Sequence, residues 1–102
     1  MLETAAFKDL RNYIKKRIKF AEYKVDSTWY PCAIAETIIT NDGIVRIKCQ
    51  VAHGAACTIT GVRLRNADQE VWATKAVNVV IENSTTNFMQ WFDFTITERE
   101  VS

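Results

Sequence analysis

The fold is decided by the stretch Asn41-Asp42-Gly43-Ile44-Val45-Arg46-Ile47-Lys48-Cys49-Gln50-Val51. Its Asp-Gly pair tolerates the positive φ angles of a tight hairpin turn. After the turn, apolar and polar side chains alternate with a period of two, which is typical of a strand with one face in a core and one in water. The stretch therefore predicts a β-hairpin with arms at about residues 37–40 and 44–51.

Short segments with the same two-residue period lie on both sides of this hairpin. Before it they are residues 20–25 and 27–34, and after it residues 57–65, 71–75, 77–81 and 88–97. Pro31 predicts an edge position or a bulge, because proline cannot donate to a strand ladder. The apolar phase changes within residues 57–65, which predicts a β-bulge near Thr60-Gly61.

The N-terminal segment has a different period. Thr4 is a candidate N-cap for a helix from about residue 5 to 21, and no glycine or proline interrupts this range. Apolar side chains recur there at steps of three and four, which indicates one apolar stripe. The stripe consists of Phe7, Leu10, Ile14, Ile18 and Ala21.

These elements predict a mixed α+β fold. We expect an N-terminal amphipathic helix followed by a six- to seven-stranded antiparallel β-sandwich or curled sheet, with the helix covering the sheet. A cystatin-like arrangement, with the helix laid across a single sheet, is the alternative. Residues 1–102 are expected to form a single domain, with the helix at about 5–21 and the β-unit at about 22–97.

The charges are distributed unevenly along the chain. Residues 1–24 contain seven Lys or Arg and three acidic residues, a net charge of +4, whereas residues 25–102 contain six and nine, a net charge of −3. This asymmetry indicates that the two parts have different surroundings or face each other across an assembly contact. The overall net charge of +1 and the absence of a second basic patch argue against nucleic acid as a partner.

The cysteine pattern indicates a reducing compartment and no metal centre. Three cysteines without a C-x-x-C pair do not suit a secreted disulfide framework. Cys49, His53 and Cys57 have spacings that zinc ligands could use, but Cys49 lies on the apolar phase of its strand and a fourth ligand is missing. Buried reduced cysteine behaves as a small hydrophobic side chain, and we expect neither a metal nor another cofactor.

No catalytic constellation is evident, so the chain is not expected to be an enzyme. A nucleophile–base pair of Cys57 and His53 would lack an orienting third group. The carboxylates fall in turns or on polar strand phases, and the three glycines are isolated, so no phosphate-binding loop exists. The segment before residue 20 is too charged for a signal peptide, and no apolar run is long enough to span a membrane.

The candidate functional residues form an interaction surface rather than a reactive site. Basic side chains of the helix could place charge against a partner, and exposed tryptophans could bind a protein or a sugar. Trp91 falls on the strand phase opposite to Phe92 and is expected to point away from the core. The candidates are Trp91, Trp72, Trp29, Lys15, Lys16 and Lys19.

Several segments together resemble a known family. They are residues 8–14 and 21–25, Thr28-Trp29-Tyr30, residues 42–47 and 59–66, Glu70-Val71-Trp72 and residues 92–96. This layout resembles small structural proteins from the tail and baseplate modules of phages and prophages of Gram-positive bacteria. The resemblance implies a non-enzymatic part of a tail or baseplate, in a virion or the bacterial cytoplasm, with other tail proteins as partners and a ring-forming homo-oligomer as an option. A carbohydrate-binding module that uses exposed tryptophans is the alternative function.

Overall fold

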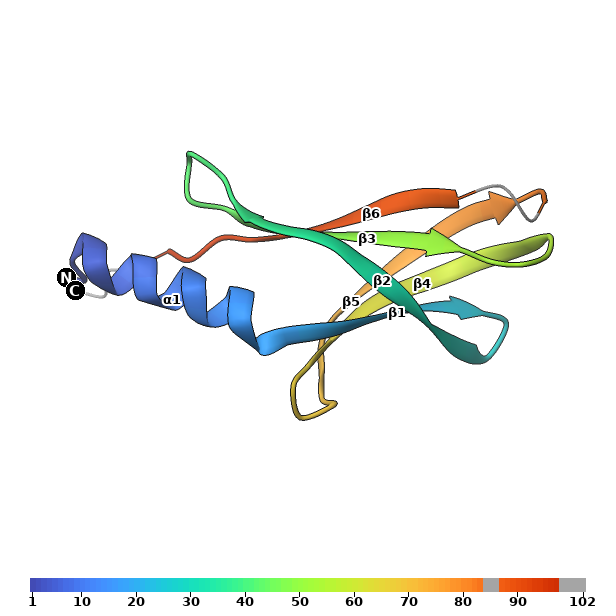
Figure 1. Cartoon of the computed structure of the whole chain (residues 1–102), viewed down its shortest axis with the longest axis horizontal. Coiled ribbons are helices and arrows are strands. Elements are labelled where there is room, and N and C mark those ends of the chain that lie inside the picture. The colour runs from blue at the N-terminus through green and yellow to red at the C-terminus, as the bar shows by residue number, and fades with distance from the viewer. Residues whose placement is uncertain (84–86, 98–102) are drawn as a thin grey trace.

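The structure, a computed structural model, describes residues 1–83 and 87–97. Within these residues the chain forms one helix followed by six strands (Figure 1). The elements are α1 (Thr4–Arg17), β1 (Ile18–Val25), β2 (Thr28–Ile39), β3 (Val45–Ala52), β4 (Cys57–Asn66), β5 (Val71–Ile81) and β6 (Asn87–Phe94). The C-terminal residues 98–102 lie outside the described residues.

All six strands belong to one antiparallel sheet with the order β5-β4-β1-β2-β3-β6. The sheet curls into a nearly closed barrel, with β5 and β6 as its two edges. The first half of β2 pairs with β1, and its second half, from Ala33 onward, pairs with β3. The predictions of an α+β fold and a curled sheet are confirmed. The strands form one curled sheet rather than the two packed sheets of the sandwich alternative.

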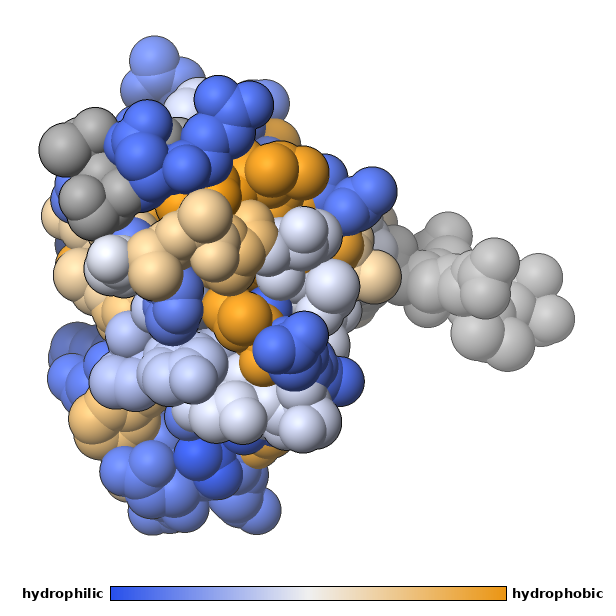
Figure 2. Space-filling view, turned by 90° about the vertical axis from the view of Figure 1, so that its right-hand side faces the viewer, coloured by the Kyte–Doolittle hydropathy of each residue, from blue (hydrophilic) through white to orange (hydrophobic). Residues whose placement is uncertain are grey.

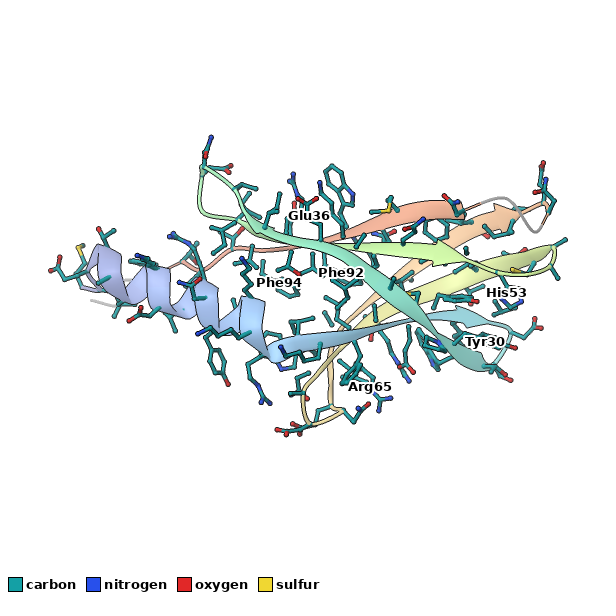
Figure 3. All side chains as sticks on the ribbon, viewed as in Figure 1. Tyr30, Glu36, His53, Arg65, Phe92 and Phe94 are labelled. Atoms are coloured by element: carbon teal, nitrogen blue, oxygen red, sulfur yellow. The ribbon has the colours of Figure 1, made fainter. Side chains whose placement is uncertain are left out.

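The central hairpin forms as predicted. Gly43 adopts φ +82°, and its N–H donates to the carbonyl oxygen of Thr40 at 3.0 Å. On β3, the side chains of the apolar phase are fully buried inside the barrel, because alternate residues of a strand face opposite sides. Figure 3 shows Phe92 and Phe94 of the neighbouring strand β6 projecting into the same interior.

The predicted bulge near Thr60-Gly61 is also present. In the β1–β4 ladder Lys24 pairs with Gly61 and Val25 with Ile59, so that Thr60 is an extra residue on β4. The β4–β5 ladder shifts register at the same place, with one extra residue on β5. The indole of Trp29 crosses the backbone at this point, and a Cβ on Gly61 would lie 3.0 Å from its ring. Glycine therefore allows the ring to lie close against the strand.

Two strands are longer than the sequence pattern indicates. β2 joins the predicted segments 27–34 and 37–40 across a register shift between Ile34 and Glu36, and β5 joins 71–75 and 77–81. Pro31 lies in the part of β2 that pairs only with β1, where it is opposite Glu22. The ladder with β3 begins at Ala33, so the other side of Pro31 is an open edge, where proline is tolerated. The strand count of six agrees with the prediction.

The helix begins at Thr4, one residue before the predicted start, but it ends four residues before the predicted end at residue 21. Glu3 rather than Thr4 is the N-cap, and its side chain makes no capping hydrogen bond. The helix ends at Arg17, because Ile18 is extended and already pairs with Asn66 of β4. The apolar side chains of residues 18–21 continue the helical spacing, but backbone pairing with β4 makes these residues part of strand β1.

The expectation that the helix covers the sheet is also wrong, in both predicted arrangements. α1 continues the line of β1 away from the barrel, and none of its residues is buried (Figure 1). The molecule is correspondingly long, with extents of 51 × 25 × 24 Å. Because the sheet curls around its own apolar face, it leaves no open apolar face for a helix to cover.

The β4–β5 turn contains a residue in an unfavourable backbone conformation. The buried side chain of Asn66 accepts hydrogen bonds from the N–H groups of Asp68 and Glu70, at 2.9 and 3.0 Å. These bonds hold the turn, in which Gln69 has φ +67°. A residue with a Cβ is disfavoured there, and glycine is the residue that adopts this conformation without strain.

Replacing Gln69 with glycine should therefore raise the free energy of unfolding by about 0.5 kcal/mol or more, since the relief of strain exceeds the added flexibility of the unfolded chain. Urea unfolding followed by circular dichroism measures this change. A matched Gln90→Gly variant on β6, a strand without a positive-φ residue, should instead lower the stability. Equal destabilisation by both variants would contradict the strain at Gln69.

Candidate functional site

Large apolar side chains are exposed in two main regions of the described chain. One region is α1, where Leu10 is 40% and Tyr13 is 55% exposed. The other lies on the two edge strands of the barrel and consists of Val71, Trp72, Val80, Met89 and Trp91. We call the second region the edge surface. Figure 2, a view onto one end of the barrel, shows hydrophobic residues gathered in the upper half between hydrophilic ones.

The apolar side chains of α1 face two directions: some pack towards the barrel and others face solvent. Phe7 and Ile14 are half-buried, and Ile14 packs against the core at the end of the barrel. The guanidinium of Arg11 lies against Gly43 of the β2–β3 turn and 5.9 Å from the ring of Phe7. The remaining apolar side chains of the stripe and its flank, Leu10 and Tyr13, face solvent. The helix is therefore held along one side only.

The predicted basic residues lie at the C-terminal end of the helix and beyond it. Lys15 and Lys16 are exposed in the last turn of α1, where positive charge is favourable near the helix carbonyl end. Arg17 beside them pairs with Asp68 at 2.9 Å. Lys19 was predicted to lie in the helix, but it lies on β1 at a register shift. The three lysines therefore do not share one helix face.

The two edge strands approach each other without forming a ladder in the described residues. The ammonium of Lys75 on β5 donates to the carbonyl oxygen of Trp91 on β6 at 3.1 Å. The rings of Trp72 and Phe94 meet edge to face, with centroids 6.3 Å apart. Side chains rather than backbone hydrogen bonds thus join the edges, and exposed edge strands of this kind are sites of association.

Trp91 is 44% exposed on the outer face of the sheet. The guanidinium carbon of Arg46 lies 4.5 Å and the ammonium of Lys48 4.9 Å from its ring centroid. Arg46 forms two hydrogen bonds with Asp93, at 2.9 and 3.0 Å, which hold the pKa of that carboxyl below its usual range. Lys48 pairs with Glu36 at 3.2 Å, and Figure 3 shows Glu36 on the outside of the sheet. The two cations on the Trp91 ring are therefore each paired with a carboxylate, while the ammonium of Lys75 at the Trp91 carbonyl adds a positive charge.

The three predicted tryptophans do not form one platform. Trp72 and Trp91 belong to the edge surface, whereas Trp29 lies on the other half of the sheet. Its ring is half-buried, 4.1 Å from the guanidinium carbon of Arg63 and 5.8 Å from the ammonium of Lys24. Trp29 therefore packs on β1 and β4 and is separate from the other two.

An aromatic cluster that the sequence did not reveal closes one end of the barrel. The phenol of Tyr23 is hydrogen-bonded to Nδ1 of His53 at 2.8 Å, and Tyr30 packs on both rings at centroid distances of 5.6 and 5.2 Å. Figure 3 shows Tyr30 and His53 at this end, from β2 and the β3–β4 loop.

Across residues 1–83 and 87–97, no group of three or more His, Cys, Asp and Glu side chains is placed to hold a metal ion.

The cysteines are free thiols, and two of them have strongly raised pKa values. Burial raises the pKa of Cys49 to about 12 and that of Cys32 to about 11, with a smaller contribution from the charge of Glu22 at Cys32. Both thiols are therefore protonated at neutral pH, and such thiols are weak nucleophiles.

Raising the pH from 9 to 11 should lower the free energy of unfolding, because Cys49 keeps its proton in the folded chain but loses it when unfolded. The stabilisation is complete below the unfolded pKa near 9 and is lost towards pH 12, at ~1 kcal/mol per pH unit for this thiol. Urea unfolding at pH 8, 10 and 11 measures the slope. Cys49→Ala should show a shallower slope, and an unchanged slope would contradict the prediction.

Comparison with known proteins finds no relative of this chain. No family model, curated protein or solved structure matches it. No helix in the described part of the chain is long and apolar enough to cross a membrane.

Proposed function

We propose that the protein is a non-enzymatic assembly protein whose copies join head to tail through α1. The observation that carries this proposal is that a helix of 14 residues has no buried residue. Helices of this length are marginal in water, and most of their stability in proteins comes from packing an apolar face. Contact with a second molecule would supply the packing that the barrel does not give.

A second copy of the same chain is the occupant that the charges favour. α1 carries five basic residues and one acidic residue, whereas residues 18–97, which contain the barrel strands, carry seven basic and eight acidic residues, a net charge of −1. Two such helices would repel each other, whereas the barrel of the next copy has no positive excess that would repel the helix. The helix and the barrel lie at opposite ends of a long molecule, which suits a head-to-tail contact that closes into a ring.

The edge surface is the region of the barrel that best fits the helix. It gathers exposed apolar side chains, and the two cations beside Trp91 are each paired with a carboxylate. Lys75, which reaches the Trp91 carbonyl, is a positive charge that a basic helix would meet there, and Leu10 and Tyr13 would pack against Met89 and Trp91. Aromatic and Met side chains of this kind are enriched in protein interfaces.

The setting that we propose for this assembly is a phage or prophage tail or baseplate, in a virion or the bacterial cytoplasm. It rests on the resemblance described above, with other tail or baseplate proteins as further partners. A part of such an assembly needs stable contacts and no reactive centre, and the edge surface consists of apolar side chains beside the ion pairs of Arg46 and Lys48.

Light scattering coupled to gel filtration tests the assembly. The full chain should elute as a particle of several times 11.7 kDa, and its mass should stay constant on tenfold dilution because a ring closes. Growth of the mass with concentration without a limit would instead indicate open filaments and contradict ring closure.

A second candidate function is carbohydrate binding at Trp91, which the exposed and rigidly held indole favours. Glycan-array binding that disappears in Trp91→Ala but persists in Trp29→Ala would support it, since Trp29 is packed against Arg63. Loss of self-association in Trp91→Ala without any glycan signal supports the assembly contact instead.

A further inference from the structure

A pocket of about 300 Å³ opens where β1 and β2 part. The last pair of their ladder is Ala21 with Cys32, after which β2 turns away to pair with β3. The volume is at the lower end of the range for ligand pockets. The lining consists of Lys19, Phe20, Ala21, Glu22, Pro31, Cys32, Arg65 and Gln69.

A β-bulge aims two of these side chains at the mouth of the pocket. Ile18 pairs with Asn66 and Phe20 pairs with Arg65, so Lys19 is an extra residue on β1. As a result both Lys19 and Phe20 point outward, and Phe20 is 43% exposed. Bulges often re-aim side chains beside functional sites.

The charges around the pocket leave a positive excess. Glu22 accepts a hydrogen bond from Arg63 at 2.7 Å, which neutralises the only carboxylate of the lining. Arg65 reaches the same carboxylate only weakly, at 3.5 Å. Among the described residues Lys19 has no ion-pair partner. Lys19 is therefore available to a ligand, together with the side of the Arg65 guanidinium that does not face Glu22.

Arg65 is held in place by the strained residue of the turn. Its Nε donates to the carbonyl oxygen of Gln69 at 2.9 Å, and Gln69 has φ +67°. This contact fixes the guanidinium at the edge of the pocket, and with Nη1 at 3.5 Å from Glu22 it leaves the Nη2 group to meet a ligand. Figure 3 shows Arg65 on the β4 side of this region. Strained backbone that positions a charged group is more common at binding sites than elsewhere.

The geometry points to a binding site for a small organic anion in this pocket. Lys19 and Arg65 would hold its carboxylate or phosphate group, because a guanidinium fork and an ammonium are the usual partners of such groups. Phe20 and Pro31 would contact its apolar body. The site is separate from α1 and the edge surface, so it does not depend on the proposed assembly.

Cys32 in the lining and Cys57 outside it allow a test within one molecule. Iodoacetate and iodoacetamide both react when a thiolate attacks the methylene carbon and iodide leaves, but only iodoacetate is an anion. The ratio of the two rates at one cysteine cancels its pKa. Because Glu22 and Lys19 act on this ratio in opposite directions at Cys32, the test is the change caused by removing Lys19 alone: at low salt Lys19→Gln should lower the ratio at Cys32 about threefold and leave that at Cys57 unchanged.

Mass spectrometry of the alkylated full-length chain at pH 9 measures both ratios. The matched Lys15→Gln variant on α1 should leave the ratio at Cys32 unchanged. No effect of Lys19→Gln on the ratio at Cys32, or an equal effect of Lys15→Gln, would overturn the proposal.

Nuclear magnetic resonance with ¹⁵N-labelled protein tests the class of ligand. Benzoate, which has an apolar body, should shift the amide signals of Phe20, Cys32 and Gln69 at lower concentration than inorganic phosphate does. An equal response to both probes would show that the apolar wall contributes nothing and would overturn the assignment to an organic anion. No shift with either probe would overturn the site itself.

Discussion

Replacing Ile47 with alanine should lower the free energy of unfolding by about 3 kcal/mol, within the range measured for buried Ile→Ala changes. Ile47 is fully buried on β3 and lies at the centre of the described core, next to Phe92 of β6 in the ladder. Removing three methyl or methylene groups there leaves a cavity that the surrounding strands cannot close. Urea unfolding followed by tryptophan fluorescence measures the change.

Ile39→Ala is the matched control. Ile39 lies on β2 in the same pair of strands, opposite Val45, but its side chain is exposed. Its replacement should cost less than about 1 kcal/mol, because little apolar surface returns to water. Similar losses for both variants would mean that the interior of the barrel is not the core of the protein.

Replacing Leu10 and Tyr13 together with glutamine should convert the assembly into monomers. Both side chains are exposed on α1, and their loss removes the apolar contact that we propose between copies. Glutamine keeps the helical propensity of leucine, so the helix itself is not broken by the change. Light scattering should give the mass of one chain, 11.7 kDa, at concentrations where the unmodified chain is assembled.

A control variant places two glutamines on another face of the same helix. Ala5 and Lys8 are exposed and lie away from the Leu10–Tyr13 side, given 100° per residue. Ala5→Gln/Lys8→Gln should keep the assembled mass. If both double variants dissociate, the helix acts through its charge or its stability and not through an apolar contact.

The sequence predicted those parts of the fold that depend on local chemistry. Asp42-Gly43 indicated a tight turn because glycine reaches the positive φ that the turn requires, and the structure has φ +82° there. The change of apolar phase around Gly61 indicated a bulge, which the β1–β4 ladder contains at Thr60. The outward position of Trp91 also followed from its strand phase.

The end of the helix could not be predicted, and the reason is specific. Ile18 and Ala21 are three residues apart, which is a helical spacing, and both are buried. They are buried in a strand, because the bulge at Lys19 inserts one residue and turns a two-residue period into a three-residue one. A bulge can therefore imitate a helix in the sequence.

Contacts between segments that are distant in the chain could not be predicted from the sequence either. The hydrogen bond between Tyr23 and His53 joins residues 30 positions apart, and Trp29 covers Gly61 only because β1, β2 and β4 are neighbours. The pocket beside Cys32 depends on the point where β2 leaves β1, which no local pattern marks. For the same reason the sequence could not separate Trp29 from Trp72 and Trp91.

A mixing experiment tests the head-to-tail contact most directly. It uses the Leu10→Gln/Tyr13→Gln variant, which keeps the edge surface, and a Met89→Gln/Trp91→Gln variant, which keeps the helix. Each alone should be a monomer, and an equal mixture should form a 1:1 heterodimer of about twice 11.7 kDa, because one intact contact remains. A mixture that stays monomeric, or a Met89→Gln/Trp91→Gln variant that still assembles alone, would contradict this contact.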